Sequence, residues 1–409
     1  MRSRVAGLDG IRAIAACSIV LLHVAESAEP NRGRYDFGWV SREVVPHLAA
    51  GVTLFFVLSG FLLYLPHVRA AIDGSSPPSI STYVRARALR IVPAYWVILA
   101  FSGYVLGTTQ LRREGHLVVG GLGGHPKIAL ANFLLVQSYV PRALATGIGP
   151  AWSLCVEVAF YAAVPLLGLL ALRLARRCGT DRGRIVAVCV PIGVMLLLGW
   201  TGRVLGAFVL QGNGPAPGWD ADWASVLDRS LLGNADLFVP GMALAVLWHC
   251  VATSRVRLNR GWRGAALVVA GVGAFAAHEH AAYELGTSND AGYYLYGPLT
   301  SLCAVALVAL VALPSAAGAR SRVVGMLDSR VVAGVGLVSY SLFLAHAPLI
   351  DWLQAHNATF GGHSGFTLTL LVVFAASLAV ATASYFMVER PALQWRARAP
   401  RATANARAG

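Results

Sequence analysis

The chain has 409 residues, of which 56% are hydrophobic and only 13% are charged, with a mean hydropathy of +0.62. This composition excludes a soluble domain, and because no polar half separates from an apolar half, it indicates one polytopic membrane domain. A net charge of +14 would suit nucleic acid, but the basic residues are spread among short loops rather than gathered on one face. We therefore expect no nucleic-acid partner.

Arginine supplies nearly all of the positive charge, since the chain has 32 arginines and a single lysine, Lys127. Together with the abundance of Ala and Gly, this indicates high-GC coding and hence a bacterial source. The preference for Arg is therefore not functional by itself. The six cysteines have neither metal-ligand nor disulfide-framework spacing, so we expect no metal site.

Ten apolar runs are long enough to cross a bilayer. They cover residues 8–28, 50–68, 88–108, 152–174, 184–208, 231–251, 262–280, 294–314, 330–354 and 366–388. The segments that join them alternate in charge, with 23 basic residues in one set and 8 in the other. The positive-inside rule places the richer set in the cytoplasm. We predict an all-α bundle of about ten transmembrane helices in the plasma membrane, with both termini cytoplasmic.

Three segments do not fit this pattern of spans. Residues 127–141 are apolar but too short to cross the bilayer, which predicts an interfacial or re-entrant piece of an outer loop. Residues 209–230, rich in Gly and Pro, predict another outer loop. The basic segment 392–409 is expected to be a disordered cytoplasmic tail after a transmembrane domain over 1–391.

The first run, LDGIRAIAACSIVLLH, carries ionisable residues at both ends, Asp9 and Arg12 at one and His23 at the other. Arg12 and His23 are eleven residues apart, so on a helix they differ by ~20° around the axis and ~16 Å along it. Ionisable groups within a span are costly and usually functional. The alternative is that Arg12 snorkels to the interface as a topology anchor and His23 is a hydrogen-bonded core residue.

Other polar residues share the outer half of the membrane with His23. Counting from Trp152, where the fourth run begins, Glu157 lies about five residues below the outer surface, the same depth as His23. His346 lies in the outer half of the ninth run, with Tyr340 nearer its middle. A buried carboxylate needs a partner, and imidazole is a natural one, so we expect Glu157 to pair with His23. A purely structural pair that holds two helices together is the alternative.

Two further blocks lie near the cytoplasmic side. GVTLFFVLSGFLLY places Ser59 and Gly60 within the second run, where small residues allow helices to pack closely. YVRARALRIVPAYW gathers Arg85, Arg87 and Arg90 at the cytoplasmic start of the third run. Three guanidinium groups there can hold phosphates, or they can simply fix the topology.

Six blocks now resemble one family. LDGIRAIAACSIVLLH, GVTLFFVLSGFLLY, VRARALRIVPAYW, WSLCVEVAFYAAVP, GLVSYSLFLAHAP and VERP are similar, in order over residues 8–391, to the acyltransferase 3 family of integral membrane O-acyltransferases. The most specific feature is the family's Arg-x10-His pattern, which Arg12 and His23 match. The family pattern has two consecutive acids in the fourth block, whereas here Val158 follows Glu157. The chain resembles the form without an appended hydrolase-like domain.

The resemblance implies transfer of an acyl group, often acetyl, from cytoplasmic acyl-CoA to a hydroxyl of a glycan or a glycosylated small molecule. It makes His23 the catalytic histidine, with Arg12 essential and Arg87 and Arg90 as contacts for CoA. We add Ser59 to the acyl-CoA site and Glu157 to the catalytic group. Asp9, Trp152, Tyr340 and His346 complete the expected pocket. No tightly bound cofactor is expected, because acyl-CoA is a co-substrate.

Two other classes of function remain as alternatives. A transporter or flippase could use Glu157, Asp236 and His346 as an intramembrane proton relay. It does not account for a cation and an imidazole on one helix face with an arginine cluster at its inner end. A non-catalytic sensor of acylated sugars is less favoured, because the sequence has no signalling module.

Overall fold

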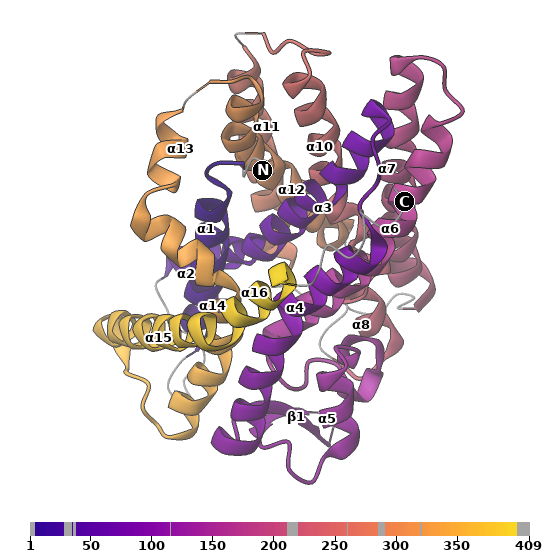
Figure 1. Cartoon of the computed structure of the whole chain (residues 1–409). Coiled ribbons are helices and arrows are strands. Elements are labelled where there is room, and N and C mark those ends of the chain that lie inside the picture. Colours follow the sequence, from indigo (N-terminus) through magenta and orange to yellow (C-terminus); the bar gives the residue numbers. More distant parts are fainter. Residues whose placement is uncertain are drawn as a thin grey trace.

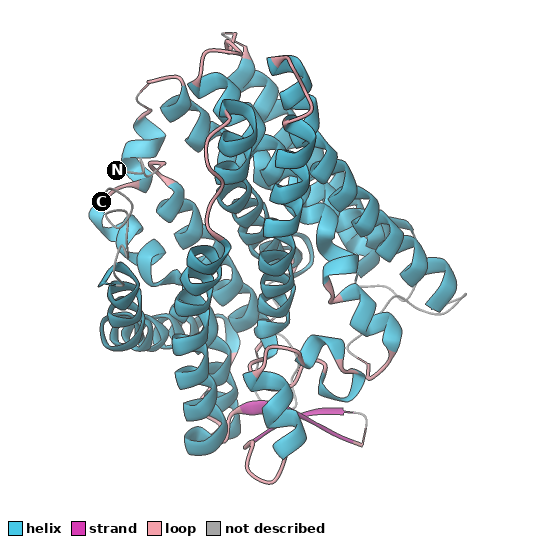
Figure 2. Cartoon of the chain, turned by 45° about the vertical axis from the view of Figure 1, so that its right-hand side comes forward, coloured by secondary structure: helices cyan, strands magenta, loops and turns pink. Residues whose placement is uncertain are grey.

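The fold was examined in a computed structural model, which describes residues 5–27, 35, 38–114, 116–210, 220–259, 261–284, 291–319 and 321–398. Figure 1 shows a bundle of long helices, with a small hairpin and α5 at the end of the bundle opposite α13. Figure 2 shows that nearly all of the remaining chain is helical. The predicted all-α membrane bundle is therefore confirmed, with one two-stranded hairpin added in the described part of the chain.

The elements follow one another without a repeat. They are α1 (Leu8–Glu26), α2 (Trp39–Glu43), α3 (Ala50–Asp73), α4 (Ile80–Ala100), β1 (Thr109–Arg113), β2 (His116–Gly120), α5 (Pro126–Phe133), α6 (Trp152–Ala175), α7 (Asp181–Val204), α8 (Trp223–Asp228), α9 (Leu231–Asn234), α10 (Val239–Ala252), α11 (Trp262–Glu284), α12 (Ala291–Ala316), α13 (Arg322–Leu327), α14 (Arg330–Ala355), α15 (Gly362–Ser384) and α16 (Arg390–Arg398).

Nine helical stretches in the described residues are long and apolar enough to cross a membrane. They correspond to nine of the ten predicted runs. The remaining run, 262–280, forms α11, whose apolar part covers Trp262–Ala276. Prolines inside α3, α4, α6 and α7 do not end these helices, as is common where neighbouring helices satisfy the freed backbone groups.

Small residues set the closest helix contacts. A Cβ atom at Gly60 of α3 would clash with the carbonyl oxygen of Phe238, and one at Gly241 of α10 would clash with that of Val57. The same relation joins α1 to α14, where a Cβ at Gly336 would clash with the carbonyl oxygen of Asp9. The close packing expected at Gly60 is therefore present, and it holds α3 against α10. The α1–α14 contact determines which side chains of these two helices meet.

Residues 107–151 form a folded cap over one end of the bundle. Its two strands pair antiparallel, with Thr109 opposite Gly120, and α5 and three short 3-10 turns follow. The expected short apolar piece at 127–141 is thus α5 plus the first two turns. The cap is tied to α14 across the bundle, because Gln110 Nε2 donates to both carboxylate oxygens of Asp351 at 3.0 Å.

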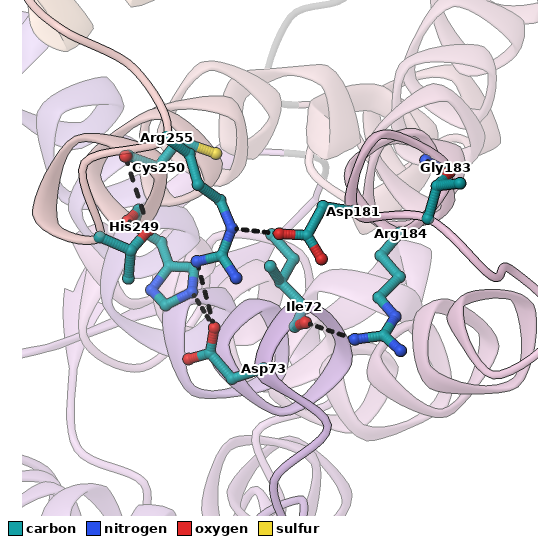
Figure 3. Close-up of polar contacts among 10 residues, drawn as sticks. Ile72, Asp73, Asp181, Gly183, Arg184, His249, Cys250 and Arg255 are labelled. Carbon is teal, nitrogen blue, oxygen red and sulfur yellow. Dashed lines mark hydrogen bonds and ion pairs between the residues drawn. The ribbon is translucent and has the colours of Figure 1, made fainter.

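At the opposite end, side chains from three segments that the charge bias assigns to the cytoplasm meet in one cluster. Figure 3 shows Asp73, Asp181, His249 and Arg255 pointing toward one another. Arg255 Nε donates to Asp181 at 3.0 Å, and His249 Nε2 lies 3.0 Å from Asp73. The ends of α3 and α10 and the start of α7 therefore share one face, as the predicted alternation requires.

The ends of the chain extend this picture only in part. The helix α16 covers residues 390–398, so the segment expected to be disordered from 392 is helical at its start. Its Trp395 ring lies 4.6 Å from the Arg85 guanidinium carbon, a cation–π contact that favours an ordered helix there. Residues 1–4, 211–219 and 399–409 lie outside the described residues, so the position of the termini remains a prediction.

Candidate active site

A cavity of about 100 Å³ lies among α1, α3, α4, α6 and α14. We call it the inner cavity. Its polar lining includes the guanidinium groups of Arg12, Arg87 and Arg90, the hydroxyl groups of Ser59, Ser153, Tyr161, Ser339 and Tyr340, and the carboxylate of Glu157. Four of the residues expected to bind acyl-CoA thus line one space, although they come from three different helices.

Two arginines of α4 enter this cavity, and a third does not. Arg87 and Arg90 are three residues apart and so project from the same helix face. Arg85 is about 200° around the helix from Arg87 and instead stacks on Trp395. The expectation that Arg85 belongs to the same cluster is therefore wrong, because the spacing of the three arginines exceeds one helix face.

The three cavity arginines differ in how fully their guanidinium groups are occupied. Arg12 pairs with Asp9 at 3.0 Å, and Arg90 pairs with the buried Glu389 at 3.1 Å. Arg87 lies over the Tyr161 ring at 5.7 Å, and its buried Nε has no hydrogen-bond partner in the described part of the chain. Unsatisfied buried donors are uncommon, so Arg87 is the cavity group best prepared to receive an anion.

Glu157 belongs to the inner cavity. It accepts hydrogen bonds from Ser59 Oγ at 2.5 Å and from Tyr161 Oη at 2.7 Å. Two hydroxyl donors and a nearby set of arginines account for a carboxylate at this depth without a histidine. Tyr340 lines the same cavity, where its hydroxyl donates to the Ile91 carbonyl oxygen at 2.9 Å and its ring lies beneath Arg90.

A second cavity, of about 320 Å³, opens on the capped end of the bundle. We call it the outer cavity. His23 and Glu26 of α1, Trp152 of α6, and Asp351 and Gln354 of α14 line it, with Gln110 and Leu117 from the cap. Arg12 and His23 therefore face different cavities, Arg12 the inner and His23 the outer, although both project from α1.

The partner of His23 is another histidine. His346 is fully buried, and its Nε2 lies 3.0 Å from His23 Nδ1, with the ring centroids 5.0 Å apart. His23 Nδ1 also lies 3.0 Å from the Ile19 carbonyl oxygen, and His346 Nδ1 lies 3.3 Å from that of Leu342. We call these two residues the histidine pair.

The carbonyl oxygens assign the tautomers of the histidine pair. Each carbonyl oxygen accepts hydrogen bonds and cannot donate, so His346 carries its proton on Nδ1 and His23 carries its proton on Nδ1. His346 Nε2 is then an acceptor for His23 Nδ1–H. The remaining ring nitrogen, His23 Nε2, is left unprotonated, which is the state a general base requires.

One helical turn separates the two cavities. On α14, Phe343 lines the inner cavity and Ala347 the outer, with His346 between them. On α6, Trp152 lines the outer cavity and the next residue, Ser153, the inner. The histidine pair therefore lies where a group held in the inner cavity comes closest to a group held in the outer one.

The expected pairing of Glu157 with His23 is wrong. The depth was counted on the assumption that α6 begins at the membrane surface. In the structure a 3-10 turn, Gly149–Ala151, leads into Trp152 beneath the cap, and Trp152 already lies at the level of His23 in the outer cavity. Glu157 is five residues further along α6, or ~7.5 Å deeper, which brings it to the inner cavity.

The proton relay of the transporter alternative is not assembled either. Asp236 forms a buried ion pair with Arg203, at 3.0 and 3.1 Å. Glu157 binds Ser59 and Tyr161, and His346 binds His23. Each of the three proposed relay groups thus has its own partners on different helices.

Sequence reasoning missed three site residues. Glu389, buried at 1% exposure, joins Arg90 to Ser341, whose hydroxyl donates to it at 2.6 Å. Asp351 and Gln110 form their contact across 241 residues. Glu389 lies in the VERP block and so carried a signal, whereas the contact between Gln110 and Asp351 depends on how the cap folds.

Comparison with known proteins agrees with this architecture. The profile of the acyltransferase 3 family, described as an acyltransferase domain, matches residues 5–386. The exopolysaccharide production protein ExoZ of Rhizobium meliloti (strain 1021) is 27% identical over 370 residues, covering 87% of this chain and 93% of ExoZ.

Two other relatives align over shorter stretches. The acyltransferase MdmB of Streptomyces mycarofaciens is 28% identical over 194 residues, which is 46% of each chain. Nodulation protein 10 of Rhizobium leguminosarum bv. viciae is 26% identical over 201 residues, covering 44% of this chain and 47% of that protein. The alignments with these two thus span about half of each relative. No solved structure matches the chain.

The family profile covers nearly all of the chain, including both cavities and the histidine pair between them. This multi-pass membrane protein belongs to the acyltransferase 3 family and is an acyltransferase.

Proposed function

We propose that the protein moves an acyl group, acetyl in the simplest case, from acyl-CoA to a hydroxyl group of a carbohydrate or glycosylated acceptor. The observation that carries this proposal is the pair of cavities separated by one turn, with arginines in one and an unprotonated imidazole nitrogen facing the other. Two substrates of different charge can thus approach the same wall from opposite sides.

The donor suits the inner cavity. CoA carries phosphate groups, and guanidinium groups hold phosphates by charge-assisted hydrogen bonds. Arg87, with its unsatisfied Nε, and Arg90 lie on the α4 face that lines this cavity, and Arg12 joins them from α1. We infer that binding of the donor anion competes with Glu389 for Arg90 and with Asp9 for Arg12.

The acceptor suits the outer cavity, where its hydroxyl group would reach His23. His23 Nε2 takes the hydroxyl proton while the hydroxyl oxygen attacks the thioester carbonyl carbon. The carbon–sulfur bond then breaks, and the leaving CoA thiolate takes the proton from His23. His346, accepting the hydrogen bond from Nδ1–H, holds the ring in place, the part that a carboxylate plays in a catalytic triad.

The relatives support a carbohydrate acceptor in general terms only. ExoZ, which aligns over nearly its whole length, is described as an exopolysaccharide production protein, and MdmB as an acyltransferase. We extend a sugar-type acceptor to this chain as part of the proposal. Acyl-CoA remains a co-substrate rather than a bound cofactor.

The full chain in lipid nanodiscs tests the proposal. Adding acetyl-CoA with a mixture of bacterial glycans should release free CoA thiol in proportion to the acetyl groups found on the glycans by mass spectrometry. Glycan-dependent transport without CoA release would instead indicate the transporter, and acetyl-glycan binding without turnover would indicate the sensor. Acetyl label on His23 in the absence of acceptor would make His23 a nucleophile rather than a base.

A further inference from the structure

The outer cavity contains a carboxylate whose environment lacks a counter-charge. Asp351 accepts from Gln110 Nε2 at 3.0 Å through both oxygens, and the part of the chain that the structure describes gives it no basic partner. Other carboxylates in the bundle are paired with arginine. These are Asp9 with Arg12, Asp228 with Arg229, Asp236 with Arg203, and Glu389 with Arg90.

An unpaired carboxylate in such a position calls for a partner from outside the chain. Removing a carboxylate from water is costly unless a cation or several donors compensate, and Gln110 supplies one neutral amide. The amide also holds both oxygens in a fixed position on the cavity wall. Asp351 is thus oriented but not neutralised.

The rest of the lining has the same character. Glu26 adds a second carboxylate and Trp152 an indole ring, and none of the described lining residues is Lys or Arg. An ammonium group is attracted both to carboxylates and to the face of an indole ring. The volume of about 320 Å³ is at the lower end of the range for small-molecule sites, which suits a sugar unit.

From this lining we infer that the acceptor is an amino sugar, which presents a protonated amine to Asp351 and its reacting hydroxyl group to His23. The inference rests on the proposed function, because it assigns the outer cavity to the acceptor. It adds a charge class: cationic sugars are favoured, neutral sugars bind less well, and uronic acids are rejected. The inner cavity has the opposite preference, since it holds arginines.

Binding of three matched probes tests the inference. The full chain in nanodiscs is titrated by calorimetry with methyl glucosaminide, methyl glucoside and methyl glucuronide. The glucosaminide should bind at least about tenfold more tightly than the glucoside, the size of one close charge contact, and the glucuronide should bind most weakly. Equal affinity for the first two, or no binding of the glucosaminide, overturns the inference without any variant.

A pair of variants then locates the preference. Asp351→Asn keeps the shape of the side chain and should reduce glucosaminide affinity to that of the glucoside. Glu114→Gln removes the same charge from the exposed turn of the hairpin, outside the cavity lining, and should leave the order unchanged. A preference that survives Asp351→Asn contradicts the assignment.

Acetyl-CoA binding to the same preparations separates this inference from the proposed function. If acetyl-CoA binds and transfers to neutral sugars while the charge preference is missing, only the amino-sugar inference fails. If acetyl-CoA neither binds nor releases CoA with any acceptor, the proposed function itself fails. Retained acetyl-CoA binding also shows that the Asp351→Asn variant is folded.

Discussion

The two cavities differ in construction as well as in charge. The inner cavity is built entirely from spanning helices, and its polar groups are three arginines, one carboxylate and several hydroxyls. The outer cavity is closed partly by the cap, which contributes Gln110 and Leu117, and its charged groups are carboxylates. A fixed helical site suits the substrate part that stays constant, and a loop-built site suits the part that varies among relatives.

The histidine pair is what the two cavities share, and removing it should separate binding from chemistry. His23→Ala should lower turnover by on the order of 10²–10⁴, the usual contribution of a general base. Acetyl-CoA should still bind, because the arginines of the inner cavity are untouched. Turnover per folded molecule and acetyl-CoA binding are measured on the same preparation. Near-normal turnover in folded His23→Ala would contradict the assignment.

The second largest effect should be confined to the donor. Arg87→Ala together with Arg90→Ala should raise the KM for acetyl-CoA, since each lost phosphate contact costs about 1.5–3 kcal/mol. The KM for the acceptor should change little, because neither arginine lines the outer cavity. Arg85→Ala is the matched control, as it lies on the same helix but contacts Trp395. Unchanged acetyl-CoA affinity in the double variant would reduce the cluster to a topology signal.

The inner cavity was largely predictable from the sequence, and the outer one was not. Arg87 and Arg90 follow from helical spacing within one block, and the placement of Arg12 and His23 along one helix needs only the 1.5 Å rise. Charge bias and apolar length likewise gave the number of helices and the alternation of their ends, because bilayer thickness constrains both strongly.

The failures trace to contacts between distant segments. Glu157 was placed one and a half turns too shallow, because the folded cap moves the start of α6 beneath the surface. The contact between His346 and His23 requires the close α1–α14 packing that Gly336 permits. Asp351 meets Gln110 only because the hairpin folds back onto α14. None of these contacts has a periodicity that a single sequence shows.

A third prediction concerns the orientation of His23. His346→Ala removes the acceptor of the Nδ1–H hydrogen bond and should lower kcat by about 1–3 kcal/mol in activation free energy. The KM for acetyl-CoA should stay within about twofold, since the cost falls on orientation rather than on donor binding. His346→Asn, which can still accept through its amide oxygen, should recover part of kcat. Loss of folded protein in both variants, with normal turnover of what remains, would make His346 only a packing residue.

The smallest effect is the one that distinguishes the two cavities most directly, because its sign depends on which cavity holds Glu157. As a partner of His23, Glu157 would be needed for turnover, and Glu157→Gln would lower kcat. As a carboxylate of the inner cavity, bound to Ser59 and Tyr161, it reduces the positive potential that attracts the donor. Glu157→Gln should then lower the KM for acetyl-CoA by about threefold, a change of ~0.7 kcal/mol, and leave kcat nearly unchanged. Asp351→Asn is the matched control, because it removes a carboxylate from the outer cavity and should leave the KM for acetyl-CoA as it was. A fall in kcat with an unchanged donor KM would return Glu157 to the histidine.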